Sequence, residues 1–204
     1  MDCAGLLMLE GHRTTFTDAF TMQDNDRRTH LYYPGTSSIL TPEQPSRIVT
    51  PCLAHLDCLI INEFEAAALA GRPIMPGAAK DIDGCVANAR DVLEAGTMRL
   101  IVVHFPSGSV AIARGTPPLI TPPLITPSVH IPKDAIAGSN GACDAFACGI
   151  LYGMHQSWTL DATLQLAHAS AAASIRSIGT TDGIADWREC PSLAGRYGLR
   201  ALPA

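Results

Sequence analysis

The chain has 204 residues, of which 47% are hydrophobic and 16% are charged, so it can bury the core of one globular domain. Its net charge of −5 offers no basic surface for nucleic acid, and no apolar run is long enough to cross a bilayer. The seven cysteines are an odd number without a C-x-x-C pair, which argues against a disulfide framework and against a zinc site. These features favour a protein of the reducing cytoplasm.

The first predicted element is a β-hairpin. Residues 15–22 alternate between polar and apolar types, residues 23–28 form a polar turn, and residues 29–33 are a second short strand-like run. Pro34 and Gly35 then end the pattern. A plain surface hairpin is enough to explain these residues.

A buried strand followed directly by a helix comes next. Residues 57–61 are the short apolar run of a parallel strand, and residues 66–70 continue as a helix that stops at Gly71. Asn62 and Glu65 lie between the two, at the carboxyl end of the strand, where ligands collect in open α/β sheets. Asn62 as the helix cap and Glu65 as a charge in its first turn explain the same residues. Both roles stay open for Asn62.

The middle of the chain reads as a helix and a pair of strands. Residues 81–95 have the apolar face of an amphipathic helix, residues 99–105 form a buried strand, and residues 109–114 look like an antiparallel return strand. His104, in the first of these strands, is expected to be a core residue. Residues 116–125 repeat Thr-Pro-Pro-Leu-Ile twice, and this density of proline predicts an extended loop.

A glycine-rich turn leads into the next predicted helix. Residues 138–143 read Gly-Ser-Asn-Gly-Ala-Cys, and Asp144 begins a small apolar helix that runs to Met154. A helix start after such a turn offers unpaired N–H donors and a partial positive charge, so it suits an anion. A carboxylate there can act as a base beside a bound phosphate, which suggests phosphoryl transfer. An ordinary loop before a core helix is the alternative interpretation.

The last long element is an alanine-rich helix over residues 158–177, with Thr159 as its cap. Its small side chains predict close packing against a neighbouring helix. Residues 179–183, Gly-Thr-Thr-Asp-Gly, are predicted to turn, and Trp187 in the short tail that follows is expected to pack.

Residues 138–153, GSNGACDAFACGILYG, resemble the second signature of the PfkB (ribokinase-like) carbohydrate kinases, which typically reads Asp-Thr-x-Gly-Ala-Gly-Asp-Ala-Phe. Asn62 and Glu65 resemble that family's Asn-x-x-Glu motif, and the first hairpin resembles its lid strands. The resemblance implies an α/β fold: a three-layer αβα, ribokinase-like (Rossmann-like) sheet, mostly parallel and incomplete at its N-terminal side, with a small β lid hairpin. It implies one kinase domain over residues 1–204, with the lid-like hairpin at 14–35 and a nucleotide- and phosphate-binding core at 55–190.

The resemblance also implies a site. In that family the glycine turn is an anion hole for the transferred phosphoryl group, its closing Asp is the catalytic base, and the Asn-x-x-Glu motif orients Mg²⁺ through water together with the phosphates. The roles implied here are Asp144 as base; Gly141, Ala142 and Cys143 as anion hole; Asn62, Gly108, His168 and Ala172 at the nucleotide; and Glu65 at Mg²⁺ through water.

The function implied is the ATP-dependent phosphorylation of a sugar hydroxymethyl group in the cytoplasm, with Mg²⁺ and with ATP as co-substrate. The expected partners are a small-molecule sugar and ATP, not nucleic acid or a membrane, and a homo-oligomer is left open.

Two positions depart from the signature, since Cys143 replaces its last glycine and Gly138 its first acidic residue. A side chain at position 143 is costly if that residue takes a positive φ. The sequence also lacks the Gly-Gly-x-x-Asn-type signature that grips the sugar, and few residues separate the lid-like part from the strand at 57–61. The alternative function is therefore a non-catalytic, nucleotide-binding remnant of such a kinase, internally deleted or truncated, that needs a partner or lacks activity.

Overall fold

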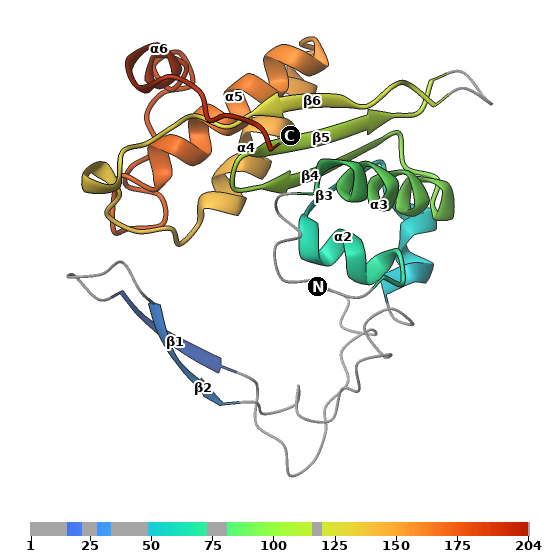
Figure 1. Ribbon diagram of the computed structural model, residues 1–204, viewed down its shortest axis with the longest axis horizontal. Helices are drawn as coiled ribbons and strands as arrows, with labels where there is room; N and C mark the ends of the chain where they lie inside the picture. The colour runs from blue at the N-terminus through green and yellow to red at the C-terminus, as the bar shows by residue number, and fades with distance from the viewer. Residues whose placement is uncertain (1–15, 22–27, 34–48, 73–80, 116–119, 204) are drawn as a thin grey trace, which may run out of the picture. The chain divides into compact units, whose positions relative to one another are not determined.

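The computed structural model describes residues 16–21, 28–33, 49–72, 81–115 and 120–203 (Figure 1). The chain divides into two compact units, Met1–Ile48 and Val49–Ala204. In the first unit, strand β1 (Phe16–Thr21) pairs antiparallel with strand β2 (Arg28–Tyr33), with Phe16 opposite Tyr33. The predicted hairpin is confirmed, and its turn lies outside the described residues.

The second unit is built on a four-stranded sheet in the order β3-β4-β5-β6. Its strands are β3 (Cys58–Asn62), β4 (Leu100–Phe105), β5 (Gly108–Ala113) and β6 (Leu124–Pro127). The pairing of β3 with β4 is parallel, whereas β4 with β5 and β5 with β6 are antiparallel. The expected return strand is therefore confirmed, and the described part of the sheet is mixed where a mostly parallel one was expected.

The proline repeat is a loop only in part. Leu124 and Ile125, which end its second copy, belong to β6 and pair with Ala111 and Val110. The loop prediction was wrong for these two residues. The strand is short, lies at the edge of the described sheet and ends at Pro127, where a missing N–H disturbs no inner ladder.

Five α-helices have both of their ends within the described residues. They are α2 (Glu63–Leu69), α3 (Ile82–Ala95), α4 (Ala142–His155), α5 (Leu160–Ser174) and the short α6 (Ser192–Tyr197). Two 3₁₀ turns, η2 (Leu53–His55) and η4 (Lys133–Ala135), complete the elements. The predicted helices over 81–95 and 158–177 are confirmed within three residues, and α2 begins at Glu63, directly after the predicted cap Asn62.

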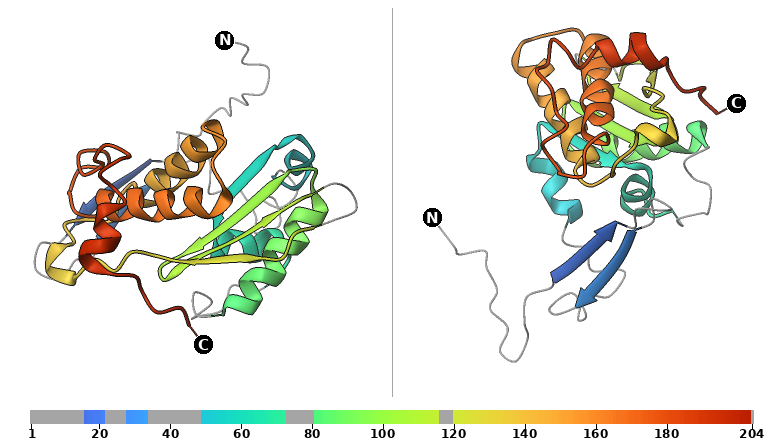
Figure 2. Two further views of the ribbon diagram at one scale, coloured as in Figure 1. Left: turned by 90° about the horizontal axis from the view of Figure 1, so that it is seen from above. Right: turned by 90° about the vertical axis from the view of Figure 1, so that its left-hand side faces the viewer.

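Alternation along β4 divides the core into two layers. Ile101, Val103 and Phe105 pack with residues of α2 and α3 on one face of the sheet. Leu100 and Val102 point to the other face and pack under α4 and α5. The left view of Figure 2 shows the sheet with α3 on one side and the α4–α5 pair on the other. This is the three-layer αβα arrangement that was predicted.

Helices α4 and α5 approach each other closely because α4 presents glycine at the contact. A Cβ built on Gly149 would lie 2.5 Å from the Cα of Ala167, so no side chain fits at this position. The prediction of close packing by the alanine-rich helix is confirmed. On the far side of α5, Trp187 packs against Tyr152 and Trp158, which confirms that the tail is anchored.

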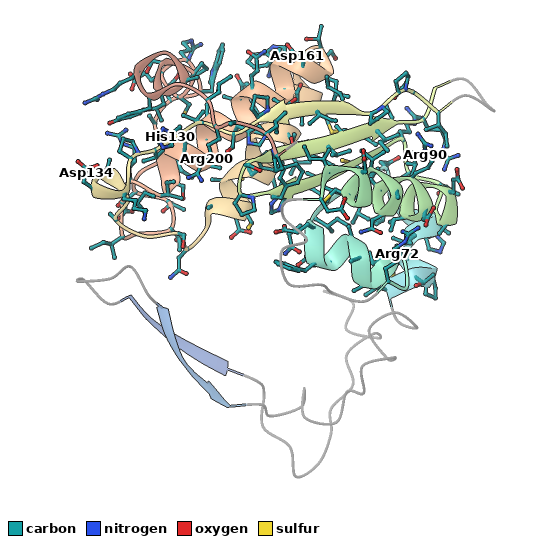
Figure 3. The ribbon with its side chains drawn as sticks, in the orientation of Figure 1. Arg72, Arg90, His130, Asp134, Asp161 and Arg200 are labelled. Carbon is teal, nitrogen blue, oxygen red and sulfur yellow. The ribbon has the colours of Figure 1, made fainter. Side chains whose placement is uncertain are left out.

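Arg72 ties the two helices of the other layer together. It follows α2, and its guanidinium donates a hydrogen bond to Asn88 and forms an ion pair with Asp91, both on α3 (Figure 3). These contacts join the C-terminal end of α2 to α3.

Candidate active site

The glycine-rich turn ends in an open helix start. Gly141 is the N-cap of α4 and has a left-handed φ of +77°, and no side chain accepts a capping hydrogen bond there. A Cβ on Gly141 would lie 2.8 Å from the carbonyl oxygen of Thr180. Glycine is therefore required twice at this position, by the backbone conformation and by the neighbouring chain. The first amides of a helix have no acceptor within it. The N–H of Ala142 makes only a long hydrogen bond, 3.5 Å, to the carbonyl of Ser139, so this end can still receive an anion.

Cys143 lies in the first turn of α4 and is exposed. Its backbone is helical, and among the described non-glycine residues only Ser157 has a positive φ. The positive φ that the turn needs falls on Gly141, two residues earlier. The departure from glycine at position 143 thus imposes no backbone strain, and the amides of Ala142 and Cys143 keep the helical orientation.

A second turn supports the first. The backbone N–H groups of Ala137 and Gly138 both donate to the carbonyl of Ile175, at 2.9 and 3.2 Å. The hydroxyl of Ser174 donates to the carbonyl of Thr180, the residue that Gly141 touches, at 3.4 Å. The predicted turn at 179–183 therefore packs beside the glycine-rich turn, and α5 positions both.

The start of α2 is closed by its own side chains. Asn62 Oδ1 accepts hydrogen bonds from the N–H groups of Phe64 and Glu65, each at 2.9 Å. Glu65 Oε2 in turn accepts from the N–H of Asn62 at 2.9 Å. The pair is a complete capping box, so the capping interpretation of Asn62 is confirmed. Glu65 remains exposed to solvent, and its role at Mg²⁺ stays a prediction.

His104 connects the two helix starts. It is paired with Asn62 across β3 and β4, and its ring lies 5.1 Å from the ring of Phe146. Phe146 is two residues after Asp144 on α4. Burial lowers the pKa of His104, and the nearby Glu65 carboxylate opposes that change. The end of β3 and the start of α4 are thus linked through one half-buried ring.

His168 lies in the same layer but is buried, with 5% of its surface exposed. Its Nε2 is 2.9 Å from the hydroxyl of Ser109 on β5, and its ring lies 4.9 Å from that of Phe146. Burial, with a smaller contribution from His104, lowers its pKa to about 4, so it is neutral at neutral pH. His168 therefore joins α5 to the sheet.

Ala172 and Gly108 are also packed by the protein itself. Ala172 is 4% exposed and belongs to the cluster on the far side of α5. A Cβ on Gly108 would meet the carbonyl of Thr126 at 2.5 Å and the side chain of Leu202 at 2.9 Å. Packing accounts for these two residues and for His168 without a ligand. Their contact with a nucleotide stays a prediction.

In the part of the chain that the structure describes, no three His, Cys, Asp or Glu side chains come close enough to hold a metal ion. A magnesium ion whose ligands are phosphate oxygens and water can be held by a single nearby carboxylate through that water, and this arrangement suits Glu65. None of the described helices is long and apolar enough to cross a membrane.

The pfkB family of carbohydrate kinases matches residues 35–187, so the chain belongs to this family. A comparison with curated proteins finds no significant match.

Three solved structures show the same fold. A probable sugar kinase from Rhizobium etli is 20% identical, with a TM-score of 0.57 over 75% of this chain and 41% of that one. Arabidopsis thaliana ribokinase, complexed with ribose and ATP, is 16% identical, with a TM-score of 0.62 over 90% of this chain and 70% of that one. A ribokinase II from E. coli, described as putative and in complex with ATP and Mg²⁺, is 16% identical, with a TM-score of 0.59 over 78% and 47%. The chain thus spans 41% to 70% of the length of these kinases.

Proposed function

We propose that this chain binds MgATP and transfers its γ-phosphoryl group to a hydroxymethyl group of a sugar. The observation that carries the proposal is the start of α4, where a left-handed glycine leaves the first helical amides without a side-chain cap and a carboxylate follows within the first turn. Such an end combines N–H donors with the positive end of the helix dipole.

The residues of this turn divide the chemistry between them. The amides of Gly141, Ala142 and Cys143 donate hydrogen bonds to the phosphoryl oxygens and stabilise the charge that develops on them. The carboxylate of Asp144 accepts the proton of the sugar hydroxyl while the oxygen of that hydroxyl bonds to the γ-phosphorus. The bond from that phosphorus to ADP breaks in the same step, so ADP leaves with the electron pair.

The other helix start has a supporting role in the proposal. Mg²⁺ neutralises charge on the phosphates when it is bound, and the exposed carboxylate of Glu65 reaches it through water. Asn62 holds Glu65 in place through the capping box. We also place Gly108, His168 and Ala172 around the nucleotide. The proposal depends least on these three residues, because each is already packed within the protein.

The complexes of the similar structures support the choice of ligands. The Arabidopsis ribokinase holds ribose and ATP, and the E. coli protein holds ATP and Mg²⁺. The proposal treats residues 1–204 as one kinase domain, with residues 14–35 as the lid-like hairpin and 55–190 as the core. Cytoplasmic location belongs to the same proposal.

A second candidate is a nucleotide-binding remnant without transferase activity. The observation in its favour is that the chain covers less than half of two of the three kinases compared above. Positioning of the acceptor contributes several kcal/mol to such reactions, and a shortened sugar side would lose this contribution.

Calorimetric titration of the full chain with MgATP, alone and with each member of a panel of sugars, tests both candidates. The kinase proposal expects binding that one sugar strengthens, followed by ADP release with that sugar. MgATP binding that no sugar changes would favour the remnant. A chain that binds no MgATP would overturn both.

A further inference from the structure

Asn140 is followed by a glycine, and the pair lies directly before the open start of α4. The asparagines of the chain are Asn25, Asn62, Asn88 and Asn140, and glycine follows Asn140 alone. The backbone nitrogen of the next residue can attack the side-chain carbonyl carbon of an asparagine, which makes asparagine chemically labile. A glycine at the next position leaves that nitrogen unhindered, because it has no Cβ. At Asn140 the chain itself therefore supplies an accessible nucleophile.

No hydrogen bond holds the reacting groups of this pair. Asn140 is half-buried and belongs to a turn, outside any helix or strand. Within the described part of the chain, neither the side chain of Asn140 nor the N–H of Gly141 makes a hydrogen bond. The side-chain amide of Asn140 can therefore turn toward the nitrogen of Gly141 without breaking a contact.

The other asparagines that the structure describes are held by their surroundings. Asn62 accepts hydrogen bonds from the N–H groups of Phe64 and Glu65 in the capping box of α2. Asn88 is 7% exposed and accepts a hydrogen bond from Arg72, and the residue after it belongs to the interior of α3. These contacts keep both side chains from folding back onto the chain. They serve as internal controls for Asn140.

The start of α4 also favours the attack electrostatically. The nitrogen of Gly141 must give up its proton, and negative charge must develop on the side-chain oxygen of Asn140. Both charges form beside the N-terminal end of a helix of 14 residues. The positive end of the helix dipole stabilises an anion at this place.

We propose that Asn140 is a site of spontaneous deamidation, which closes the open start of α4. The nitrogen of Gly141 bonds to the side-chain carbonyl carbon of Asn140, and the bond from that carbon to Nδ2 breaks. Ammonia leaves with the electron pair and with the proton that the nitrogen of Gly141 has lost. Water then opens the cyclic imide at either of its carbonyl groups and returns a proton to the nitrogen. The product at position 140 is an aspartate or an isoaspartate.

The product changes the charge of the proposed phosphate site, and this consequence rests on the proposed function. A carboxylate at position 140 lies two residues before Ala142, the first residue of α4, where it competes with phosphate for the open helix start. Together with Asp144 it places a second negative charge there. An isoaspartate also adds one carbon to the backbone beside Gly141, which already lies close to Thr180. We therefore expect deamidation to weaken the binding of MgATP.

Peptide mapping of the folded full chain, incubated in mildly alkaline buffer, tests the chemical step. Mass spectrometry distinguishes a carboxylate from an amide at each asparagine, and enzymatic methylation detects isoaspartate. We expect Asn140 to convert before Asn62 and Asn88, with aspartate and isoaspartate both formed. Conversion of Asn62 or Asn88 at the same rate would overturn the proposal. Conversion of Asn140 to aspartate alone would exclude the cyclic imide.

The same incubation in urea separates the fold from the local sequence. The folded chain should convert Asn140 at least as fast as the unfolded chain, because no contact in the fold restrains this side chain. An Asn140 that stays intact in the folded chain while it converts in urea would overturn the proposal, since the fold would then protect it.

Two substitutions test the consequence for binding. Asn140→Asp copies one product, and Asn140→Gln keeps a neutral amide on a longer side chain that cyclises much more slowly. Calorimetry should show that Asn140→Asp binds MgATP about tenfold more weakly than the wild type, because like charges meet at the site. Asn140→Gln should bind as the wild type does and should keep its affinity during the incubation. Circular dichroism spectra like that of the wild type would show that both variants fold.

The outcomes separate this proposal from the proposed function. Equal MgATP affinity of Asn140→Asp and Asn140→Gln would overturn the closing of the helix start. A wild-type chain that binds no MgATP would overturn the proposed function, whereas the peptide map still decides whether Asn140 deamidates.

Discussion

The starts of α2 and α4 follow the same rule of backbone chemistry but satisfy it in different ways. At α2 the side chains of Asn62 and Glu65 close the helix end from within, with three hydrogen bonds of 2.9 Å each. At α4 the N-cap is Gly141, and no side chain closes the end. The starts of α3 and α5 resemble that of α2, since the side chains of Asp81 and Thr159 cap them.

The difference separates a structural end from an end that can bind. A capped helix start has spent donors on a side chain, whereas the start of α4 spends none on a side-chain cap. The chain supports the open end from outside, through the turn at Thr180 and the packing of Phe146. Four substitutions test this contrast, beginning with the largest expected effect.

Asp144→Asn removes the proposed base but keeps the shape of the open end. We expect transfer to fall by about 10²- to 10⁴-fold, with MgATP affinity nearly unchanged, because proton transfer contributes by this amount. Assays of ADP release and calorimetry measure the two effects. Asp161→Asn is the matched control, since Asp161 stands in the first turn of the capped helix α5. Equal turnover in wild type and Asp144→Asn would exclude Asp144 as the base.

His168→Asn tests the buried layer that supports α4. The pKa of His168 is about 4 in the folded protein, below the value of 6.5 for an unperturbed histidine. The folded state therefore binds fewer protons than the unfolded state between these values, and stability is lost as pH falls through this window. The full loss in the free energy of unfolding is about 3 kcal/mol.

Urea unfolding at pH 7 and at pH 4.5 measures this loss. The His168→Asn variant cannot gain a proton there, so its stability should fall less with acid than that of the wild type. The half-buried His104, whose pKa is also lowered, contributes in the same direction in both proteins. An unchanged pH slope in the variant would contradict the assignment to His168.

Gly141→Ala should both strain the open end and disturb its support. A non-glycine residue at positive φ costs about 1–2 kcal/mol, and the clash with Thr180 adds to this. Gly71→Ala is the comparison for strain alone, because Gly71 has a φ of +69° and no atom within 4 Å of the added Cβ. Thermal or urea unfolding of both variants gives the comparison. Equal losses would mean that Thr180 gives way without cost.

Asn62→Ala should have the smallest effect. This substitution removes the side chain that caps the start of α2. Loss of the cap costs about 1 kcal/mol of stability, and Asn62→Asp keeps an acceptor and should cost little. Urea unfolding measures both. Calorimetry then shows whether Asn62 does more than cap. If Asn62→Asp binds MgATP as the wild type does, the capping role is sufficient.

Local patterns in the sequence were enough for much of this fold. The alternation of residues 15–22 and 29–33 predicted the hairpin, and the caps at Asn62 and Thr159 were predicted from residue type and spacing. These features depend on neighbours within a few positions, so sequence periodicity records them. The resemblance at residues 138–153 and at Asn62 and Glu65 was likewise sufficient to identify the family to which the chain belongs.

Only the tertiary structure decided which of the candidate site residues are exposed to a ligand and which are buried. It placed the positive φ on Gly141 and left Cys143 helical, because Thr180, far along the chain, packs against the turn. It also buried His168 and Ala172 and drew the end of the proline repeat into β6. Contacts between distant segments set burial and backbone conformation at these positions, and no local pattern in the sequence encodes them.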